Sequence, residues 1–437
     1  MSRPRTRVAA ASAASAGDDL DAVIVGASLA GCSAALFLAR AGLRVALVEQ
    51  RPDPAAFKRT CTHYIQSCAL PTLERLELLD AIGAAGGVRS SMRMLTRWGW
   101  IRPLPDSPPP AAVNLRRELL DPLLRSAAAE QAGVELILGH RVDRVLERDG
   151  AVGGVEAVAP DGTRRRLGAR LTIGADGRHS EVGRLAGVRT RSAELGRFAY
   201  AGYFEGPPTA AAPAATIWML DPQWAGTFPT DAGQTVYGCM PTVDRLPEFR
   251  RDPEAALRRY LGDLPSPPPI ADSRLTEPLI GSLSIPTVHR DATGPGLALV
   301  GDAALASDPL WGVGCGWALQ SGEWLADSVA PALAGAEPLE RGLRRYRRER
   351  RRRLWTHSVM IDSYARGRRM NMVERTMFSA AARDARLGNV AISYGSRLIK
   401  PTALLAPGVL ARGGAANARH ALGRSRAARS PAAVETA

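Results

Sequence analysis

The sequence is short of lysine, of long apolar stretches and of aromatic residues. Its 437 residues include two lysines, Lys58 and Lys400, so the net charge of +14 comes almost entirely from arginine. No run of 18 apolar residues occurs, so no transmembrane helix is expected. Aromatic residues make up 5% and do not interleave with basic ones as a nucleic-acid recognition module requires. We therefore expect a basic protein that binds no nucleic acid.

Cysteine is also scarce, and its spacing excludes two kinds of site. The cysteines are odd in number, scattered and without Cys-x-x-Cys spacing: Cys32, Cys61, Cys68, Cys239 and Cys315. This pattern argues against a zinc site and against a disulfide framework, so we expect no bound metal and a reducing, cytoplasmic location. Residues 1–18 are basic and rich in Ala and Ser but lack the apolar core of a signal peptide, and we expect a disordered tail there.

The most informative stretch runs from Asp21 to Glu49. A short β-branched run is followed by a Gly-rich turn, an apolar helix pattern and a second apolar run that ends in an acidic residue. This order predicts a βαβ unit with a dinucleotide-binding fingerprint, in which the helix N-terminus faces a pyrophosphate and the acidic residue bonds ribose hydroxyls. The middle glycine of the pattern is replaced by Ser28. The cofactor-binding candidates are Gly26, Ser28, Leu29, Ala30, Gly31, Glu49, Gln50 and Arg51.

Two further strand-to-turn motifs point to the same cofactor. One runs from Arg170 to Val182 and contains an Asp-Gly pair, Asp176 and Gly177, before a helix that Ser180 caps. In the other, a strand ends in Gly-Asp-Ala-Ala and a Gly-rich turn precedes a helix, an arrangement that suits negative charge. Its cofactor-binding candidates are Gly301, Asp302, Pro309, Gly312, Val313 and Gly314.

Other candidates lie on loops and at a helix start. The polar loop from Lys58 to Cys68 contains His63, which either transfers a proton near a substrate or hydrogen-bonds only within its loop. Arg116 and Arg117 begin a helix, where an arginine clamps a phosphate or remains a solvated surface residue.

Residues 196–290 are rich in aromatic and β-branched residues and predict an antiparallel sheet with one face toward a substrate. Each candidate wall residue is more often plain core than pocket. The candidate pocket residues are Tyr64, Trp218, Phe228, Tyr237, Met240 and Trp311.

The C-terminal third is dominated by arginine. Residues 341–353 carry nine arginines on a helix-like stretch, which favours a solvated helical face and leaves docking of an acidic partner open. The sequence predicts a cofactor domain from 19–95, 111–190 and 286–335, and a substrate-binding sheet domain from 96–110 and 191–285. C-terminal helices are expected over 336–400 and a poorly ordered tail over 401–437.

Together, the motifs resemble those of the FAD-dependent monooxygenase superfamily with the para-hydroxybenzoate hydroxylase fold, over residues 20–335. The resemblance implies an α/β fold with a GR2-type Rossmann-like FAD-binding domain, an inserted antiparallel-sheet substrate domain and a C-terminal helical segment. It implies FAD at Gly26–Glu49, at Arg117 or Arg116, and at Asp302, with NADPH or NADH as a transient reductant that shares Asp176 and Gly177. The implied activity is oxygen transfer from O2, through a flavin C4a-hydroperoxide, to a small apolar or aromatic metabolite of a secondary pathway.

Departures from that pattern keep alternatives open. Leu305 stands where the hydroxylases usually have His after Gly-Asp-Ala-Ala, and Lys58 to Cys61 is similar to the corresponding stretch of geranylgeranyl reductases. Those reductases saturate isoprenoid double bonds, and this activity is the first alternative. Flavin-dependent halogenases share the fold, but their Trp-x-Trp-x-Ile-Pro motif is only loosely matched by Trp98 to Pro103. A flavin-fold binding protein without catalysis is the remaining hypothesis.

Overall fold

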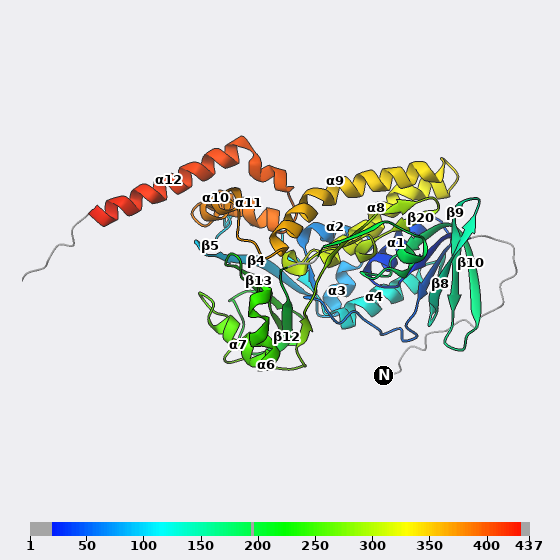
Figure 1. The fold of residues 1–437 in the computed structure, drawn as a ribbon, viewed down its shortest axis with the longest axis horizontal. Coiled ribbons are helices and arrows are strands. Elements are labelled where there is room, and N and C mark those ends of the chain that lie inside the picture. Colours follow the sequence, from blue (N-terminus) through cyan, green and yellow to red (C-terminus); the bar gives the residue numbers. More distant parts are fainter. Residues whose placement is uncertain (1–19, 194–195, 430–437) are drawn as a thin grey trace, which may run out of the picture.

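Two large sheets and a helical C-terminal part make up the computed structural model, which describes residues 20–193 and 196–429 (Figure 1). The mixed α/β architecture predicted from the sequence is confirmed: a Rossmann-like sheet, an inserted, largely antiparallel sheet and C-terminal helices. The tail predicted over residues 1–18 lies outside the described residues.

The first sheet is organised around β1 (Leu20–Val25), which has parallel neighbours β2 (Val45–Glu49) and β10 (Arg164–Gly174) on its two sides. The strand order is β19-β20-β10-β1-β2-β7, and an antiparallel pair of strands extends from β10. β1 and β2 are almost wholly apolar and buried, as expected for parallel strands covered on both faces. The carboxyl ends of β1, β10 and β20 meet at one edge, and each of the three sequence motifs follows one of these ends. The other strands are β7 (Val134–Leu138), β8 (Arg141–Arg148), β9 (Ala151–Val158), β19 (Thr293–Gly294) and β20 (Leu297–Leu299).

Helix α1 (Leu29–Arg40) is buried from Leu29 to Ala39 because α8 (Gly314–Leu333) packs directly against it. The two helices approach closely: Ser33 Oγ donates to the Leu319 carbonyl at 2.8 Å, and a Cβ at Gly322 would lie 2.7 Å from the Ala34 nitrogen. Helix α4 (Arg117–Glu130) packs on the other side of α1 and on β7. Shorter helices complete this part: α2 (Leu70–Arg75), α3 (Leu79–Ala84) and α5 (Glu181–Leu185).

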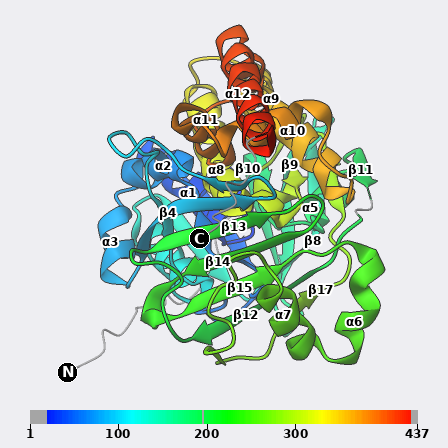
Figure 2. The same cartoon turned by 90° about the vertical axis from the view of Figure 1, so that its left-hand side faces the viewer.

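The second sheet has the order β16-β12-β15-β14-β13-β4-β6-β3, with β17 beside β12 and β5 beside β4. Its strands run side by side in Figure 2, and helices α6 (Leu246–Arg251) and α7 (Pro253–Gly262) lie on one face. Its strands are β3 (Tyr64–Ile65), β4 (Val88–Thr96), β5 (Gly99–Ile101), β6 (Ala112–Asn114), β12 (Ala199–Glu205), β13 (Ala214–Met219), β14 (Trp224–Pro229), β15 (Thr235–Cys239), β16 (Arg274–Leu275) and β17 (Ile280–Ser282). A third, small sheet is formed by β11 (Thr190–Ala193), β18 (Thr287–Arg290) and β21 (Leu305–Ala306).

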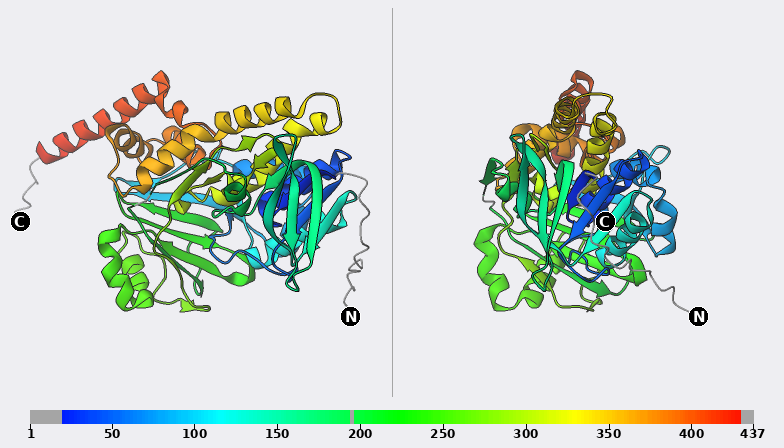
Figure 3. Two further views of the ribbon diagram at one scale, coloured as in Figure 1. Left: turned by 45° about the vertical axis from the view of Figure 1, so that its right-hand side comes forward. Right: turned by 90° about the vertical axis from the view of Figure 1, so that its right-hand side faces the viewer.

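The C-terminal helices cover the opposite face of the second sheet, and the long helix α9 (Leu339–Ala365) runs along α8 (Figure 3). Side chains from these helices form one apolar cluster with β13, β14 and β15, whereas α6 and α7 form another with the reverse face. The elements after α9 are α10 (Met372–Ala381), α11 (Ala385–Gly395), the 3-10 turn η6 (Pro401–Leu405) and α12 (Pro407–Arg429).

The structure corrects two of the predicted boundaries. Residues 401–429, predicted as a poorly ordered tail, form η6 and α12, because Ala-rich sequence is a good helix former and Ala416 packs, 5% exposed, beside α10. The rest of that predicted tail, 430–437, lies outside the described residues. The substrate sheet also recruits β3, β4 and β6 from ranges predicted to belong to the cofactor domain.

Candidate active site

The turn between β1 and α1 leaves a helix N-terminus uncapped. Gly26 has φ +104°, and a Cβ there would lie 2.6 Å from the Ala175 carbonyl oxygen, so the turn requires glycine. Glu49 fixes the turn, since its carboxylate accepts hydrogen bonds from the Ala27 and Arg51 amides at 3.0 Å each. The Ser28 side chain makes no cap hydrogen bond to α1. The first amides of α1 therefore have no partner within the helix and are available to an anion.

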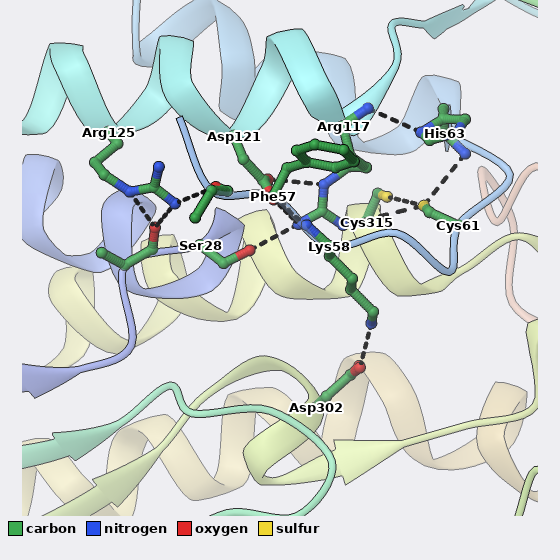
Figure 4. A network of polar contacts seen from close by, with 12 residues as sticks. Ser28, Phe57, Lys58, Cys61, His63, Arg117, Asp121, Arg125, Asp302 and Cys315 are labelled. Atoms are coloured by element: carbon green, nitrogen blue, oxygen red, sulfur yellow. Dashed lines mark hydrogen bonds and ion pairs between the residues drawn. The ribbon is translucent and has the colours of Figure 1, made fainter. Parts of the chain in front are cut away.

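Three side chains on α4 hold this turn from the side (Figure 4). The buried Arg117 guanidinium donates to both Asp121 carboxylate oxygens, at 2.7 and 2.9 Å, and to Ser28 Oγ at 2.7 Å. Arg125 donates to the Ala27 carbonyl at 3.1 Å. The neighbouring Arg116 points elsewhere and pairs with Asp231 of the substrate sheet at 2.7 Å. Of the two candidate arginines, only Arg117 contacts the fingerprint turn.

An ion pair crosses the crevice between the first and third motifs. Asp302, in the 3-10 turn η4 (Gly301–Ala303) after β20, accepts a hydrogen bond from Lys58 Nζ at 3.0 Å. Lys58 is half-exposed, and in Figure 4 its side chain points toward Asp302. Gly301 donates its amide to Ser321 Oγ on α8 at 2.8 Å, which holds η4 against that helix. The Asp302 carboxylate thus faces the fingerprint turn from the opposite side.

A second turn precedes α8. In η5 (Pro309–Trp311) the Asp308 carboxylate caps the Leu310 amide at 2.8 Å, and Gly312 adopts the left-handed conformation at φ +61°. Val313 and Gly314 then begin α8. Burial raises the pKa of Asp308 to about 7, and its Oδ2 atom has no protein partner among the described residues.

The Asp176 carboxylate forms its hydrogen bonds within its own loop. Its carboxylate accepts hydrogen bonds from Ser180 Oγ at 2.6 Å and from the Val182 amide at 2.9 Å, which places it at the start of α5. Burial raises the pKa of Asp176. Gly177 follows with φ +83°. The motif therefore forms at the carboxyl end of β10, and both carboxylate oxygens are used within the motif.

His63 joins the cofactor part to the substrate sheet. It is 1% exposed and has the left-handed φ of +61°, which is uncommon for a residue other than glycine. Its Nδ1 accepts the Arg117 amide at 2.9 Å, so the proton of the neutral ring lies on Nε2, which donates to Tyr203 Oη at 2.5 Å. Burial lowers the pKa of His63 and raises that of Tyr203. The pair is therefore neutral at physiological pH, and the Tyr203 hydroxyl keeps its own proton to donate.

Two thiols meet beside this pair. Cys61 Sγ and Cys315 Sγ are 3.5 Å apart, and the sulfur of Cys61 also accepts the His63 amide at 3.2 Å. The hydrogen bond from Cys315 holds the pKa of Cys61 well below its usual range, and Arg117 and Lys58 act in the same direction. Both cysteines are free thiols. Cys61 is therefore the thiolate-forming member of the pair.

A cavity of about 360 Å³ lies between the substrate sheet and the C-terminal helices. A smaller cavity of about 20 Å³ lies at the Leu310–Gly312 turn, and Met219 and Trp311 line both. The two cavities are therefore neighbours that share part of one apolar wall, and we refer to the pair as the apolar passage. The smaller cavity is lined by Tyr64, Met92, Met94, Ile217, Met219, Trp224, Phe228, Leu310, Trp311, Gly312 and Gly395.

The family model described as "FAD binding domain" matches residues 19–359. The chain belongs to this FAD-binding family. Its relatives include the menaquinone reductase of Mycolicibacterium smegmatis, 31% identical over 331 residues, which cover 70% of this chain and 75% of the relative. Another is the digeranylgeranylglycerophospholipid reductase 2 of Methanothermobacter thermautotrophicus, 26% identical, with 76% of this chain and 84% of the relative covered.

Solved structures share the fold at lower identity. A flavin-dependent brominase is 17% identical with a TM-score of 0.75, over 93% of this chain and all of that chain. The p-nitrophenol 4-monooxygenase of Pseudomonas putida DLL-E4 is 21% identical with a TM-score of 0.71, over 88% of this chain and 99% of that chain. At these identities the likeness shows the fold alone.

The observed geometry fits FAD. The uncapped start of α1 and the Arg117 cation beside Ser28 suit the pyrophosphate of FAD. Asp302 faces this turn across the crevice, where a carboxylate suits hydroxyl groups of the cofactor. Gly301, Pro309, Gly312, Val313 and Gly314 form the turn and helix start on the side of the apolar passage. Gln50 and Arg51 follow β2 as exposed residues, and Leu29, Ala30 and Gly31 are the first residues of α1.

The predicted pocket wall was partly wrong. Trp218 and Tyr237 point to the reverse face, where Trp218 Nε1 donates to the Pro265 carbonyl at 3.0 Å and both side chains pack in the cluster with α7. Every residue of β13 is buried, so no alternation of polar and apolar residues marks the cavity face. Tyr64, Phe228 and Trp311 line the passage. Met240 packs in the cluster on the same face.

The sequence analysis missed several residues of the site. Tyr203 and Met219 lie on strands, and Asp231 lies in the 3-10 turn between β14 and β15. All three are far along the chain from their partners, so no local pattern reveals them. Asp121 was detectable, because it stands four residues after Arg117 on the same helix, which is the spacing of an ion pair. The residues of α10, α11 and η6 that line the larger cavity carry no recognisable motif.

Proposed function

We propose that this protein is an FAD-dependent reductase that saturates a carbon–carbon double bond in a long, apolar, isoprenoid-like substrate. The observation that carries the proposal is the pair of neighbouring apolar cavities, of which the larger, about 360 Å³, lies between the sheet and the C-terminal helices. In this proposal, movement of Met219 and Trp311 joins the two cavities and accommodates a chain-like substrate. Two of the relatives are a menaquinone reductase and a digeranylgeranylglycerophospholipid reductase, and their names support the same substrate class.

In this proposal each part of the site has one task. FAD, once reduced by NADPH or NADH, supplies hydride equivalents. The α1 turn and Arg117 bind its pyrophosphate, and Asp302 orients it from across the crevice. Met219 and Trp311 exclude water and position the substrate in the passage. We assign Tyr203 as the proton donor when the double bond is saturated, because the neutral His63 holds its hydroxyl and its side chain packs in the same apolar cluster as Met219 and Phe228.

Oxygen transfer, the first hypothesis from the sequence, is the second candidate. The observation that favours it is the same buried His63–Tyr203 pair, because hydroxylation of an apolar metabolite also requires an ordered proton donor. This candidate consumes O2 and inserts one of its oxygen atoms into the product. The two reactions therefore differ in whether the substrate is oxidised by O2 or accepts hydride without it.

The test begins with the purified yellow protein, reduced by NADPH or NADH without oxygen. A polyprenyl alcohol such as geranylgeraniol is then added, and the flavin spectrum and the product mass are followed. We expect the flavin to reoxidise and the probe to gain two hydrogen atoms per double bond. Met219→Trp, which fills the passage, should abolish this reoxidation, whereas Tyr237→Phe on the reverse face should leave it unchanged. Reoxidation only by isotope-labelled O2, with label in the product, would instead establish oxygen transfer.

A further inference from the structure

The mouth of the larger cavity is surrounded by exposed apolar side chains. Four residues that line the cavity are also exposed to solvent: Trp355 by 56%, Val359 by 48%, Val373 by 42% and Leu405 by 54%. Met372, next to Val373, is 80% exposed. Single exposed apolar residues are ordinary on a protein surface, but a ring of them around one opening marks an interaction site. We define this ring of five residues as the apolar rim.

The rim lies in the most basic part of the chain. Residues 351–422 contain thirteen arginines and lysines and three acidic residues, a net charge of +10 against +14 for the whole sequence. Each of the three carboxylates already has a partner: Asp362 with His289 at 2.8 Å, Glu374 with Arg368 at 2.7 Å and Asp384 with Arg412 at 2.8 Å. Exposed cations stand within five residues of the apolar rim in the sequence: Arg351, Arg369, Arg375 and Lys400, together with Arg352, which already pairs with Glu349 at 2.7 Å.

The apolar rim and the cations that flank it lie on the same side of the molecule. The rim residues come from the C-terminal half of α9, the start of α10 and η6, elements that lie on the opposite side of the substrate sheet from α6 and α7 (Figures 1 and 2). An acidic protein partner would use the cations but would leave Trp355 and Met372 in water. An apolar protein surface would leave the cations unpaired. An anionic lipid bilayer satisfies both, because its phosphates meet arginine and its acyl boundary accepts tryptophan, leucine and methionine.

We propose that the apolar rim and its flanking cations dock this protein onto the surface of an anionic phospholipid bilayer. No helix among the described residues is long and apolar enough to cross a membrane, so the chain lies on the bilayer by this face. The docked orientation opens the cavity mouth directly into the acyl region. The proposed isoprenoid-like substrate then enters the passage without crossing water, and this last consequence rests on the proposed function. The Arg-rich stretch 341–353, considered above for an acidic protein partner, adjoins this face through α9.

Binding to lipid vesicles tests the docking without any turnover. The full-length protein is mixed with vesicles of pure phosphatidylcholine or of phosphatidylcholine with phosphatidylglycerol, and bound protein is measured by flotation. We expect binding to the anionic vesicles that weakens as salt is raised, and little binding to the neutral ones. Replacing Arg369 and Lys400 by Gln should weaken binding about fivefold per residue. The double variant Trp355→Ser with Met372→Ser should also bind the anionic vesicles more weakly. Its remaining binding should still weaken as salt is raised.

Matched substitutions elsewhere serve as controls. Leu283→Ser removes an apolar side chain that is 48% exposed, and Arg251→Gln removes an exposed arginine, both in the substrate-sheet part of the chain. Both variants should bind anionic vesicles like the unchanged protein.

Several outcomes would overturn the docking proposal: no binding to anionic vesicles, equal loss in the control variants, or binding of a polyglutamate peptide that Trp355→Ser leaves unchanged. The last result would assign the face to an acidic protein. Vesicle binding without reduction of a polyprenyl probe would retain the docking and refute the proposed reaction.

Discussion

Deleting one atom, the hydroxyl oxygen of Tyr203, breaks the hydrogen bond between His63 and Tyr203. The structure determines how much this change lowers the free energy of unfolding. In Tyr203→Phe the His63 Nε2–H loses its acceptor, while Nδ1 still accepts the Arg117 amide at 2.9 Å. His63 is 1% exposed, so water cannot replace the lost hydroxyl. A buried donor left without a partner costs about 1–3 kcal/mol. We expect Tyr203→Phe to lower the free energy of unfolding by about 2 kcal/mol, a factor of about 30 in the unfolding equilibrium.

Urea unfolding of the apoprotein at pH 7.5 measures this effect. The matched control is Tyr237→Phe, because the Tyr237 hydroxyl lies 3.5 Å from Ser273 Oγ, at the limit of a hydrogen bond, on the reverse face of the same sheet. The control should change the unfolding free energy by less than about 0.5 kcal/mol. If Tyr203→Phe unfolds at the same urea concentration as the unchanged protein, the assignment of the proton to Nε2 and the tautomer argument that follows from it are refuted.

Three further changes probe the crevice. Asp302→Ala removes a carboxylate that faces the fingerprint turn and should weaken FAD binding about 10- to 100-fold, whereas Asp291→Ala, in an exposed ion pair, should leave the flavin content unchanged. Cys315→Ala removes the hydrogen bond that lowers the pKa of Cys61, so alkylation of Cys61 by iodoacetamide should require higher pH; an unchanged pH profile would contradict the thiol contact. Burial raises the pKa of Asp308 from 3.8 to about 7, so the stability that this group contributes should be lost as pH rises from about 4 to about 7. Asp308→Asn should abolish this loss and be up to about 4 kcal/mol more stable at pH 8, as measured by urea unfolding across that range.

The sequence predicted the cofactor end of the molecule because that end depends on local backbone rules. Gly26 needs a positive φ, and Gly31 lies against the Gly26 carbonyl, where no side chain fits. Both requirements can be recognised from a few consecutive residues of the sequence. The same holds for the Asp-Gly turn after β10, where Gly177 has φ +83°. Such motifs predict where a turn forms and which group it can hold, whatever the rest of the chain does.

The substrate end was less predictable because its geometry depends on residues far apart in the sequence. His63 and Tyr203 are 140 residues apart, and only the folded sheet brings them together. Trp218 and Met219 are adjacent and both buried, so sequence alone cannot tell which of the two faces the cavity. The answer depends on α7 covering one face and α10 and α11 the other. Composition misled the prediction for 401–429 in a different way, since glycine and arginine there obscured an Ala-rich helix.

The order of segments in the FAD-binding part has a consequence for biosynthesis. Strand β1 and helix α1 precede the other parts of the FAD-binding site in the chain, whereas Asp302 and the helix that buries α1 follow about 280 residues later, after the whole substrate sheet. Contacts of such long sequence separation form slowly. A nascent chain that ends before residue 333 leaves the apolar side of α1 uncovered, so it depends on chaperones or on rapid completion to avoid aggregation. We therefore expect flavin to bind only after α8 has been made.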